Sequence, residues 1–545
     1  MRSLATLVLL TLLGAGVAAA APGDHQWSRT YNATARSAGD GAGGAVTAAT
    51  FLNTVDFGSG PVTASNFTFG DVAVVQYAED GTVLWLTQVS PPSGGVAIYD
   101  VTVDAAGAVY VGGILWFGEV DFGGGLLSGD SQCFLVKFDA NGDHVWSGLY
   151  GEFELRALSV AGSRLAAIGG NFGDVDFGGG VLSPSGWGDV CVGVLDLDGN
   201  HVWSAQWGDA ELQTALGGGL DGADNLTLSV SIQGAADFGG GALTASATDM
   251  GLVSFDPSGA HRWSQLFSGV FNPFGTIEAT CTVGADGRSA LTGYLSGPAD
   301  FGGGPVSAGG AGDVFVASFD AAGQHEWSAA YGGSGDDRGL GVSFDAAGNL
   351  AVTGRMSGTV DFGGGPLSEV GGGGDLFLAI YDAAGLHRAS RIYGGPMLDA
   401  SLLVEHAPGG ELVVSGYAQA GFDLGGGAFA SNQSFVGRLD GLGGDVAVGE
   451  LPAAAGRLLG AHPNPFNPAT SIRFNLPRNM AARLTIHDAA GHHVAVLADG
   501  PQAEGEHLVR WNGLDDAGRP QPSGLYLAVL ETAGGRAASK LTLLK

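Results

Sequence analysis

The chain is poor in cysteine and in basic residues. It holds three cysteines in 545 residues, Cys133, Cys191 and Cys281, and an odd number this small does not make a disulfide framework. All three lie in apolar, strand-like runs, which favours small buried side chains. Lys and Arg number 22 against 54 Asp and Glu, giving a formal net charge of -32. Such a surface repels nucleic acid and anionic membranes, and we interpret it as a solubility feature rather than as recognition of a cationic ligand.

Long apolar runs are absent beyond the N-terminus. No later segment reaches the roughly 18 uninterrupted apolar residues of a membrane span. The chain begins MRSLATLVLLTLLGAGVAAAAPGD, with one positive residue (Arg2), an apolar run and then small residues. This layout predicts a secretory signal over 1–21, cut after Ala20 or Ala21. The alternative is a membrane anchor, which the polar PGDHQW that follows disfavours, so we expect an exported protein with no transmembrane segment after signal removal.

The motifs of common catalytic and cofactor sites are missing as well. The sequence has no G-x-S-x-G elbow, H-E-x-x-H, phosphate loop or C-x-x-C. Its recurring DFG lacks the glycine-rich loop, lysine strand and HRD phrase of a kinase. The D…G…W spacing is superficially similar to the tryptophan-docking repeats of quinoprotein dehydrogenases, but their adjacent cysteines are absent. We therefore predict no catalytic residue, no cofactor and no metal.

What the sequence has in abundance is glycine, 99 residues without a collagen-like period, and one recurring phrase. The phrase reads FDANGDHVWSGLYG at 138–151 and FDAAGQHEWSAAYGG at 319–333, and a seventh copy has Ala389 in the tryptophan position. Internal repeats of this kind indicate stacked structural units. The tryptophans lie 58, 61, 57, 60 and 64 residues apart, at Trp27, Trp85, Trp146, Trp203, Trp263 and Trp327. A second marker, DFG, recurs at Asp56, Asp121, Asp176, Asp237, Asp300 and Asp361, with FDLGGG (422–427) as its seventh copy.

Each repeat unit contains about four strands by its pattern. In the sixth unit these are HEWSAAYG, LGVSFDAAG, NLAVTGRM (with TVDFGGG after it) and DLFLAIYD. Trp327 and Tyr331 fall on one face because side chains alternate along a strand, and we expect them to fill the space between neighbouring sheets. Seven units of four short strands predict an all-β fold with a seven-bladed β-propeller over 22–450. The runner-up is a β-solenoid, whose rungs of 20–30 residues fit a period near 60 less well.

Units such as GGSGDDRGLGVSFDAAGNLAVTGRMSGTVDFGGGPLS resemble the bacterial SBBP-type β-propeller repeat. The resemblance covers roughly residues 25–450, and several phrases recur in a fixed order. It implies an exported bacterial protein with a propeller fold, and it brings no catalytic residues with it.

A different segment follows the repeats. After a predicted linker at 451–462, residues 463–545 show alternating strands separated by glycine turns, which predicts a small Ig-like β-sandwich. PNPFNP, WNGLDDAGR, SGLYLAVL and the terminal KLTLLK resemble the type A sorting domain of the type IX secretion system and the Ig-like domain of the flagellar hook-capping protein. WNG stands where the family usually has WDG. The resemblance implies a delivery tag, with the secretion machinery as partner and the cell exterior or outer surface as location.

Histidines are the sharpest candidate for a site. His25, His144, His201, His261, His325 and His387 all lie two residues before the tryptophan position, and Val83 breaks the series. Histidine is a common metal ligand. Each of these residues belongs to a different blade, however, so we expect a ring of separated side chains rather than one site.

Two loops have the i, i+2, i+4 acidic spacing of calcium loops. They are Asp139/Asn141/Asp143 and Asp196/Asp198/Asn200, and both lack the later bidentate glutamate. Turn formation by Asp and Asn explains them without a metal, and the sequence leaves calcium open.

Two functions from different classes remain. The first is a noncatalytic protein for binding or surface display, with a glycan or a protein as ligand. The second is a secreted carbohydrate-active enzyme with paired acids in the propeller mouth. The repeats differ mainly in loop length and in Gly, Ala and Ser content, which favours the first.

The repeat ends predict how the propeller is completed. HQWSRTY (25–31) has no acid-ended strand before it, and FVGRLD (435–440) has no tryptophan strand after it. Because an open sheet edge invites aggregation, we expect the two to pair antiparallel in one blade. The competing arrangement pairs FVGRLD with DVAVG (445–449) instead.

Overall fold

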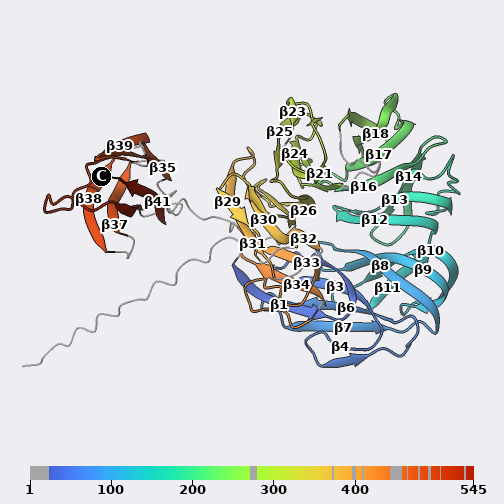
Figure 1. Ribbon diagram of the computed structural model, residues 1–545. Helices are drawn as coiled ribbons and strands as arrows, with labels where there is room; N and C mark the ends of the chain where they lie inside the picture. Colours follow the sequence, from blue (N-terminus) through green and yellow to red (C-terminus); the bar gives the residue numbers. More distant parts are fainter. Residues whose placement is uncertain are drawn as a thin grey trace, which may run out of the picture. The chain divides into compact units, whose positions relative to one another are not determined.

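The computed structural model describes residues 24–544, except 270–278, 308, 371–372, 396–400, 408–409, 432, 442–456, 463, 465, 477–478, 489–491, 504 and 533–534. The predicted signal (1–21) and DVAVG lie outside these ranges. The chain divides into two compact units, Met1–Gly444 and Asp445–Lys545 (Figure 1). Within the described ranges no helix is long and apolar enough to cross a membrane.

The first unit is a seven-bladed β-propeller, as predicted. Seven four-stranded antiparallel sheets follow one another around a central axis (Figure 1). We number these blades in chain order and give their strands from the axis outward. Blade 1 is β2 (Thr34–Gly39), β3 (Ala45–Phe51), β6 (Asp71–Tyr77) and β7 (Val83–Val89); blade 2 is β8 (Ser93–Val103), β9 (Val109–Asp121), β10 (Leu126–Phe138) and β11 (His144–Leu149); blade 3 is β12 (Gly151–Ala161), β13 (Arg164–Val175), β14 (Asp189–Asp196) and β15 (His201–Trp207).

The remaining blades repeat this order, and short hairpins join the second and third strands of three blades. Blade 4 is β16 (Gln213–Leu220), β17 (Leu226–Asp237), β18 (Ala242–Phe255) and β19 (His261–Phe267); blade 5 is β20 (Ala279–Val283), β21 (Ser289–Leu295), β24 (Asp313–Phe319) and β25 (His325–Tyr331); blade 6 is β26 (Arg338–Phe344), β27 (Leu350–Met356), β30 (Asp375–Tyr381) and β31 (His387–Tyr393); blade 7 is β32 (Ser401–His406), β33 (Leu412–Ala418), β34 (Gln433–Leu439) and β1 (His25–Tyr31). The short hairpins are β4 (Thr54–Asp56) with β5 (Pro61–Thr63), β22 (Ala299–Asp300) with β23 (Pro305–Val306), and β28 (Thr359–Asp361) with β29 (Pro366–Ser368).

The central strands of a blade are apolar because both of their faces are covered. Every residue of β24 (DVFVASF) and of β30 (DLFLAIY) is buried. The buried apolar side chains gather into seven clusters, one in each space between neighbouring blades, and blades 7 and 1 share such a cluster like any other pair. Burial of this apolar area is the main source of the propeller's stability.

Strands from opposite ends of the repeat region complete blade 7. β1 pairs antiparallel with β34, with Ser28 opposite Gly437 and Tyr31 opposite Ser434. The predicted pairing of HQWSRTY with FVGRLD is therefore confirmed. Beyond the ladder, the Asp440 amide donates to the Asp24 carbonyl at 2.9 Å.

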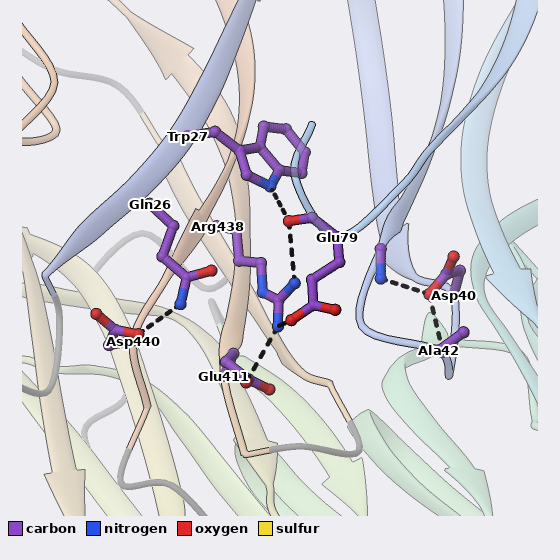
Figure 2. A network of polar contacts seen from close by, with 9 residues as sticks. Gln26, Trp27, Asp40, Ala42, Glu79, Glu411, Arg438 and Asp440 are labelled. Carbon is purple, nitrogen blue, oxygen red and sulfur yellow. Dashed lines mark hydrogen bonds and ion pairs between the residues drawn. The ribbon is translucent and has the colours of Figure 1, made fainter. Parts of the chain in front are cut away.

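A buried arginine stands at the junction of blades 7 and 1. Arg438 of β34 is 1% exposed and forms ion pairs with Glu79 at 3.3 Å and Glu411 at 3.1 Å (Figure 2). The backbone carbonyl of Glu79, in a turn of blade 1, accepts from Arg438 at 3.1 Å and from the Trp27 indole at 2.9 Å. Breaking this buried ion-pair network is costly, because removing one partner leaves the opposite charge without compensation.

The second unit is a sandwich of two antiparallel sheets. One holds β35 (Arg457–His462), β36 (Thr470–Leu476) and β39 (Gly505–Trp511); the other holds β38 (His493–Gln502), β37 (Met480–Asp488), β40 (Gly524–Thr532) and β41 (Gly535–Leu543). Phe466 of PNPFNP and Trp511 of WNG are both buried, with ring centroids 5.4 Å apart. Phe466 also exchanges backbone hydrogen bonds with the terminal strand, at Thr542 and Leu544.

The predicted linker at 451–462 is wrong over its second half. Residues 457–462 form β35, which pairs with β36 along its length. The end of the repeat pattern indicated where the propeller ends. A single short edge strand such as β35 has no repeat by which the sequence could have predicted it. The two units divide between Gly444 and Asp445, a few residues before the expected boundary at 450.

Candidate functional site

The six aligned histidines support the blades and do not meet. Each imidazole lies against the glycine-rich turn of its own blade, which reads DFGGG in blades 2–6 and DLGGG in blade 7. A Cβ atom added to the middle glycine of that turn would come within 2.2–2.3 Å of the ring. In five of the six, Nε2 also lies 3.0–3.1 Å from the hydroxyl of the serine three residues on. In the described part of the chain, no three His, Cys, Asp or Glu side chains are grouped to hold a metal ion.

One signal that the sequence reading missed explains why Val83 breaks the series. Blade 1 has DFGSG instead of DFGGG, so Ser59 takes the place of the middle glycine. In the other blades the histidine ring excludes any side chain there, whereas Val83 faces this turn in blade 1 and Ser59 is accommodated. The two exceptions therefore occur together for a steric reason.

The repeated tryptophans join a blade to the next at six of the seven junctions. Trp263 packs on Gly323, in the outer hairpin of blade 5, and donates its indole N–H to the Ala321 carbonyl at 3.1 Å. Trp27 does the same across the junction of blades 7 and 1, on Gly81 and the Glu79 carbonyl. These hairpin glycines have φ between 77° and 83°, a left-handed conformation that glycine adopts without strain: Gly81, Gly142, Gly199, Gly259, Gly323 and Gly385.

The two loops with calcium-like spacing are hairpins closed by an aspartate. In the first, Asp139 Oδ1 accepts from the amides of Asn141 at 2.8 Å and Asp143 at 3.0 Å, and these bonds lower the pKa of Asp139. Asp196 accepts from its own loop in the same way. Asp320 makes the same bonds in DAAGQ, where no second acidic residue is present. Turn closure thus accounts for the leading aspartate.

Described residues of the innermost strands line a hollow in the central channel. It has a volume of about 760 Å³, and all seven innermost strands contribute to its wall. Its ionisable side chains are Arg36, Asp100, Glu154, Arg156, Glu405 and His406. Such a cavity is large enough for a small ligand.

Side chains in the channel satisfy backbone groups of the neighbouring blade. Asp100 (blade 2) accepts from the Leu158 amide (blade 3) at 2.6 Å, and Glu405 (blade 7) accepts from the Gly39 amide (blade 1) at 2.9 Å. Arg36 donates to the Tyr99 carbonyl across the space between blades 1 and 2, at 3.1 Å. The innermost strand is the edge of each sheet, so its backbone groups need partners from outside the sheet.

The surrounding channel wall changes the acidity of these groups. Desolvation raises the pKa of Glu405 to about 7, and the nearby Asp100 carboxyl adds to the effect. Desolvation likewise raises the pKa of Asp100 to about 6, although the Leu158 amide opposes it. His406 has its pKa lowered to about 4 by desolvation, so it is neutral at pH 7. The channel therefore contains carboxyl groups that titrate near neutral pH.

The three cysteines are buried and free, as the sequence predicted. Desolvation raises the pKa of Cys191 and of Cys281 to about 12, and raises that of Cys133 further. Because the thiolate is the reactive form, these thiols are inert at neutral pH.

Comparison with known families identifies the C-terminal unit. Residues 466–535 match the family described as the FlgD Ig-like domain. This range contains Phe466 and Trp511, whose rings pack together in the core of the sandwich. Among curated proteins, none matches the chain.

Solved structures of β-rich proteins are similar at low identity. A fungal alcohol oxidase of the AA5 family, in complex with copper, is 10% identical, covers 96% of this chain and 100% of its own, and has a TM-score of 0.36. PorZ, a surface component of the type IX secretion system of Porphyromonas gingivalis, is 11% identical over 94% of this chain and 82% of its own, with a TM-score of 0.23. Latent dimeric PorU from the same organism is 12% identical over 74% and 36%, with a TM-score of 0.15. None of the three bears on the activity of this chain.

Proposed function

We propose that this protein is exported to the cell exterior or outer surface of a bacterium, where its propeller serves binding or display and has no catalytic role. Residues 463–545 act as the sorting domain that the secretion machinery recognises, and residues 1–21 as the signal for the first membrane. The observation that carries this proposal is the match of residues 466–535 to the FlgD Ig-like domain.

The proposed role in binding or display, without catalysis, rests on the propeller. Its most repeated residues have structural roles: the histidine packs on the glycine turn of its own blade, the tryptophan packs on the next blade, and the aspartate closes a hairpin. Because these side chains are engaged in packing and hydrogen bonds, we assign the function to surfaces that differ between blades. The resemblance to SBBP-type repeats is part of this proposal and fits an exported propeller with a glycan or protein ligand.

Export is tested by removing the tail. The full chain and a chain ending at residue 450 are expressed in a bacterium that has type IX secretion, and the medium, surface and periplasm are probed. We expect the full chain outside the cell and the shortened chain in the periplasm. Mature protein should begin at Ala21 or Pro22. Equal export of both chains would contradict the sorting role.

A second candidate function rests on the channel. Asp100 and Glu405 line one cavity, and their raised pKa values, about 6 and about 7, would let Glu405 act as a general acid while Asp100 is mostly ionised at pH 7. A secreted carbohydrate-active enzyme would use such a pair on a glycosidic bond. Hydrolysis of any polysaccharide that disappears in Glu405→Gln, with folding unchanged, would favour this candidate over binding alone.

A further inference from the structure

Exposed aromatic side chains of the propeller gather at one end of four consecutive blades. All of those among its described residues lie where the second strand leads into the third, at the same end of each blade. The blades are 7, 1, 2 and 3, which are neighbours in the ring. We call this set the aromatic arc: Tyr417 in blade 7, Phe67 and Phe69 in blade 1, Trp116 and Phe117 in blade 2, and Phe172 and Trp187 in blade 3.

The arc is continuous across at least one boundary between blades. The rings of Phe69 and Phe117 meet edge to face with centroids 4.9 Å apart, joining blades 1 and 2. Trp187 is 81% exposed and Phe67 is 73% exposed. Leaving such rings in water is unfavourable, and groups of them on a surface mark interaction sites.

The connections that carry the arc contain charges of one sign in their own sequence, while Arg29 of β1 reaches Gly58 of the first connection. The four connections that carry it, 52–70, 115–132, 171–188 and 417–433, contain seven acidic residues and no Lys or Arg. Exposed Glu152 lies directly beside Gly173, next to Phe172. Residues 445–545 hold nine Asp or Glu and nine Lys or Arg, so the whole net charge of -32 belongs to the propeller unit.

We propose that the aromatic arc binds a basic polypeptide segment, with Arg or Lys side chains on the ring faces and the carboxylates around them. A cation over an aromatic face is attracted by the ring quadrupole, and guanidinium groups also stack on such rings. The sequence alone favoured solubility as the reason for the negative charge; beside the exposed rings, the same charge also steers a basic partner and repels an acidic one. This inference rests on the proposed binding function and names its partner class.

Binding of the purified full chain to a hexa-arginine peptide tests the inference without involving export. Isothermal titration is run at low salt and at 0.5 M NaCl, with cellohexaose as a neutral glycan probe. We expect the peptide to bind at low salt, binding to weaken at high salt because the charges are screened, and cellohexaose not to bind. No peptide binding, or cellohexaose binding of equal affinity, overturns the inference while leaving the export proposal untouched.

Matched variants separate the arc from the general negative charge. Trp187→Ala and Phe67→Ala each remove an exposed ring, and we expect each to weaken peptide binding about threefold to tenfold. Val370→Ala is the control, since Val370 is also exposed in the equivalent connection of blade 6, which has no exposed aromatic side chain among its described residues. Equal affinity of both ring variants and the wild-type chain would show that the net charge alone attracts the peptide, and would overturn the inference.

Discussion

In six blades, the repeat histidine occurs together with a glycine in the middle of the turn beneath it. The imidazole occupies the space that a Cβ atom would need, at 2.2–2.3 Å, so the middle residue of the turn has no side chain. In blade 1, Val83 occupies the histidine position and Ser59 occupies the position of the middle glycine. The histidine repeat is therefore a packing rule, and its one exception follows the same rule.

We expect Val83→His to destabilise the chain by about 1–3 kcal/mol, because the new ring meets the Ser59 side chain. Adding Ser59→Gly should restore most of that loss. The free energy of unfolding is measured with urea for the two single variants and the double variant. Additive effects, with no rescue, would contradict the steric coupling.

The channel carboxyl groups make stability depend on pH. The pKa of Glu405 in the folded chain, about 7, lies above its ordinary value of 4.5. The folded state therefore keeps the proton up to a higher pH than the unfolded state does. Stability is then greatest at low pH for this group and is lost as pH rises from about 4.5 to 7. His406, with its lowered pKa of about 4, acts in the opposite direction below pH 6.5.

Replacing Glu405 by Gln isolates its contribution. We expect the wild-type chain to lose stability relative to Glu405→Gln between pH 5 and pH 8, because only the wild type must ionise a desolvated carboxyl. Thermal melts of both proteins across this range provide the comparison. A constant difference between their melting temperatures would show that Glu405 is not the titrating group.

At the scale of elements, the outermost strand of a blade forms the edge of its sheet and also contacts the next blade through its tryptophan, where it has one. Blade 6 carries Ala389 at the tryptophan position, and blade 7 is the one blade whose two outer strands come from opposite ends of the repeat region. No hairpin can join β34 to β1 within the repeat, so there is no turn for a tryptophan to pack on. Arg391 pairs instead with Asp24 at 2.5 Å.

Trp263→Ala should cost about 2–4 kcal/mol, since the half-buried ring loses both its packing on blade 5 and its hydrogen bond to Ala321. Val145→Ala is a suitable control, because Val145 precedes the tryptophan of blade 2 and is exposed; its effect should stay within about 0.5 kcal/mol. Urea unfolding gives both values. A cost for Trp263→Ala no larger than the control's would contradict the connecting role.

Much of this architecture could be predicted from the period of the sequence. The seven tryptophan positions and the alternating strands indicated the blades, and the unpaired strands at either end indicated the β1–β34 ladder. The channel could not be predicted, because Asp100 and Glu405 are far apart in sequence and meet only through the ring. The aromatic arc was equally hidden, since its residues lie outside the repeated DFG phrase, at positions that do not recur from blade to blade.

At the scale of the whole molecule, the two units should fold independently. Each has its own core, and the sandwich core contains residues from 466 to 543 only. We expect a chain of residues 22–450 to melt in one cooperative transition, recorded by circular dichroism. Absence of a cooperative transition would show that the tail is needed for the propeller to fold.

Tryptophans of the repeated phrase join six of the seven pairs of neighbouring blades, including blades 7 and 1, and this joining is our central claim. Hydrogen exchange of Trp27→Ala tests it most directly, with exposed Leu84→Ala as the control. We predict faster amide exchange in the blade 1 turn at 78–82, where the ring and its Glu79 hydrogen bond are lost, and unchanged exchange in blade 4. Unchanged protection at 78–82 in a folded Trp27→Ala chain would contradict the claim.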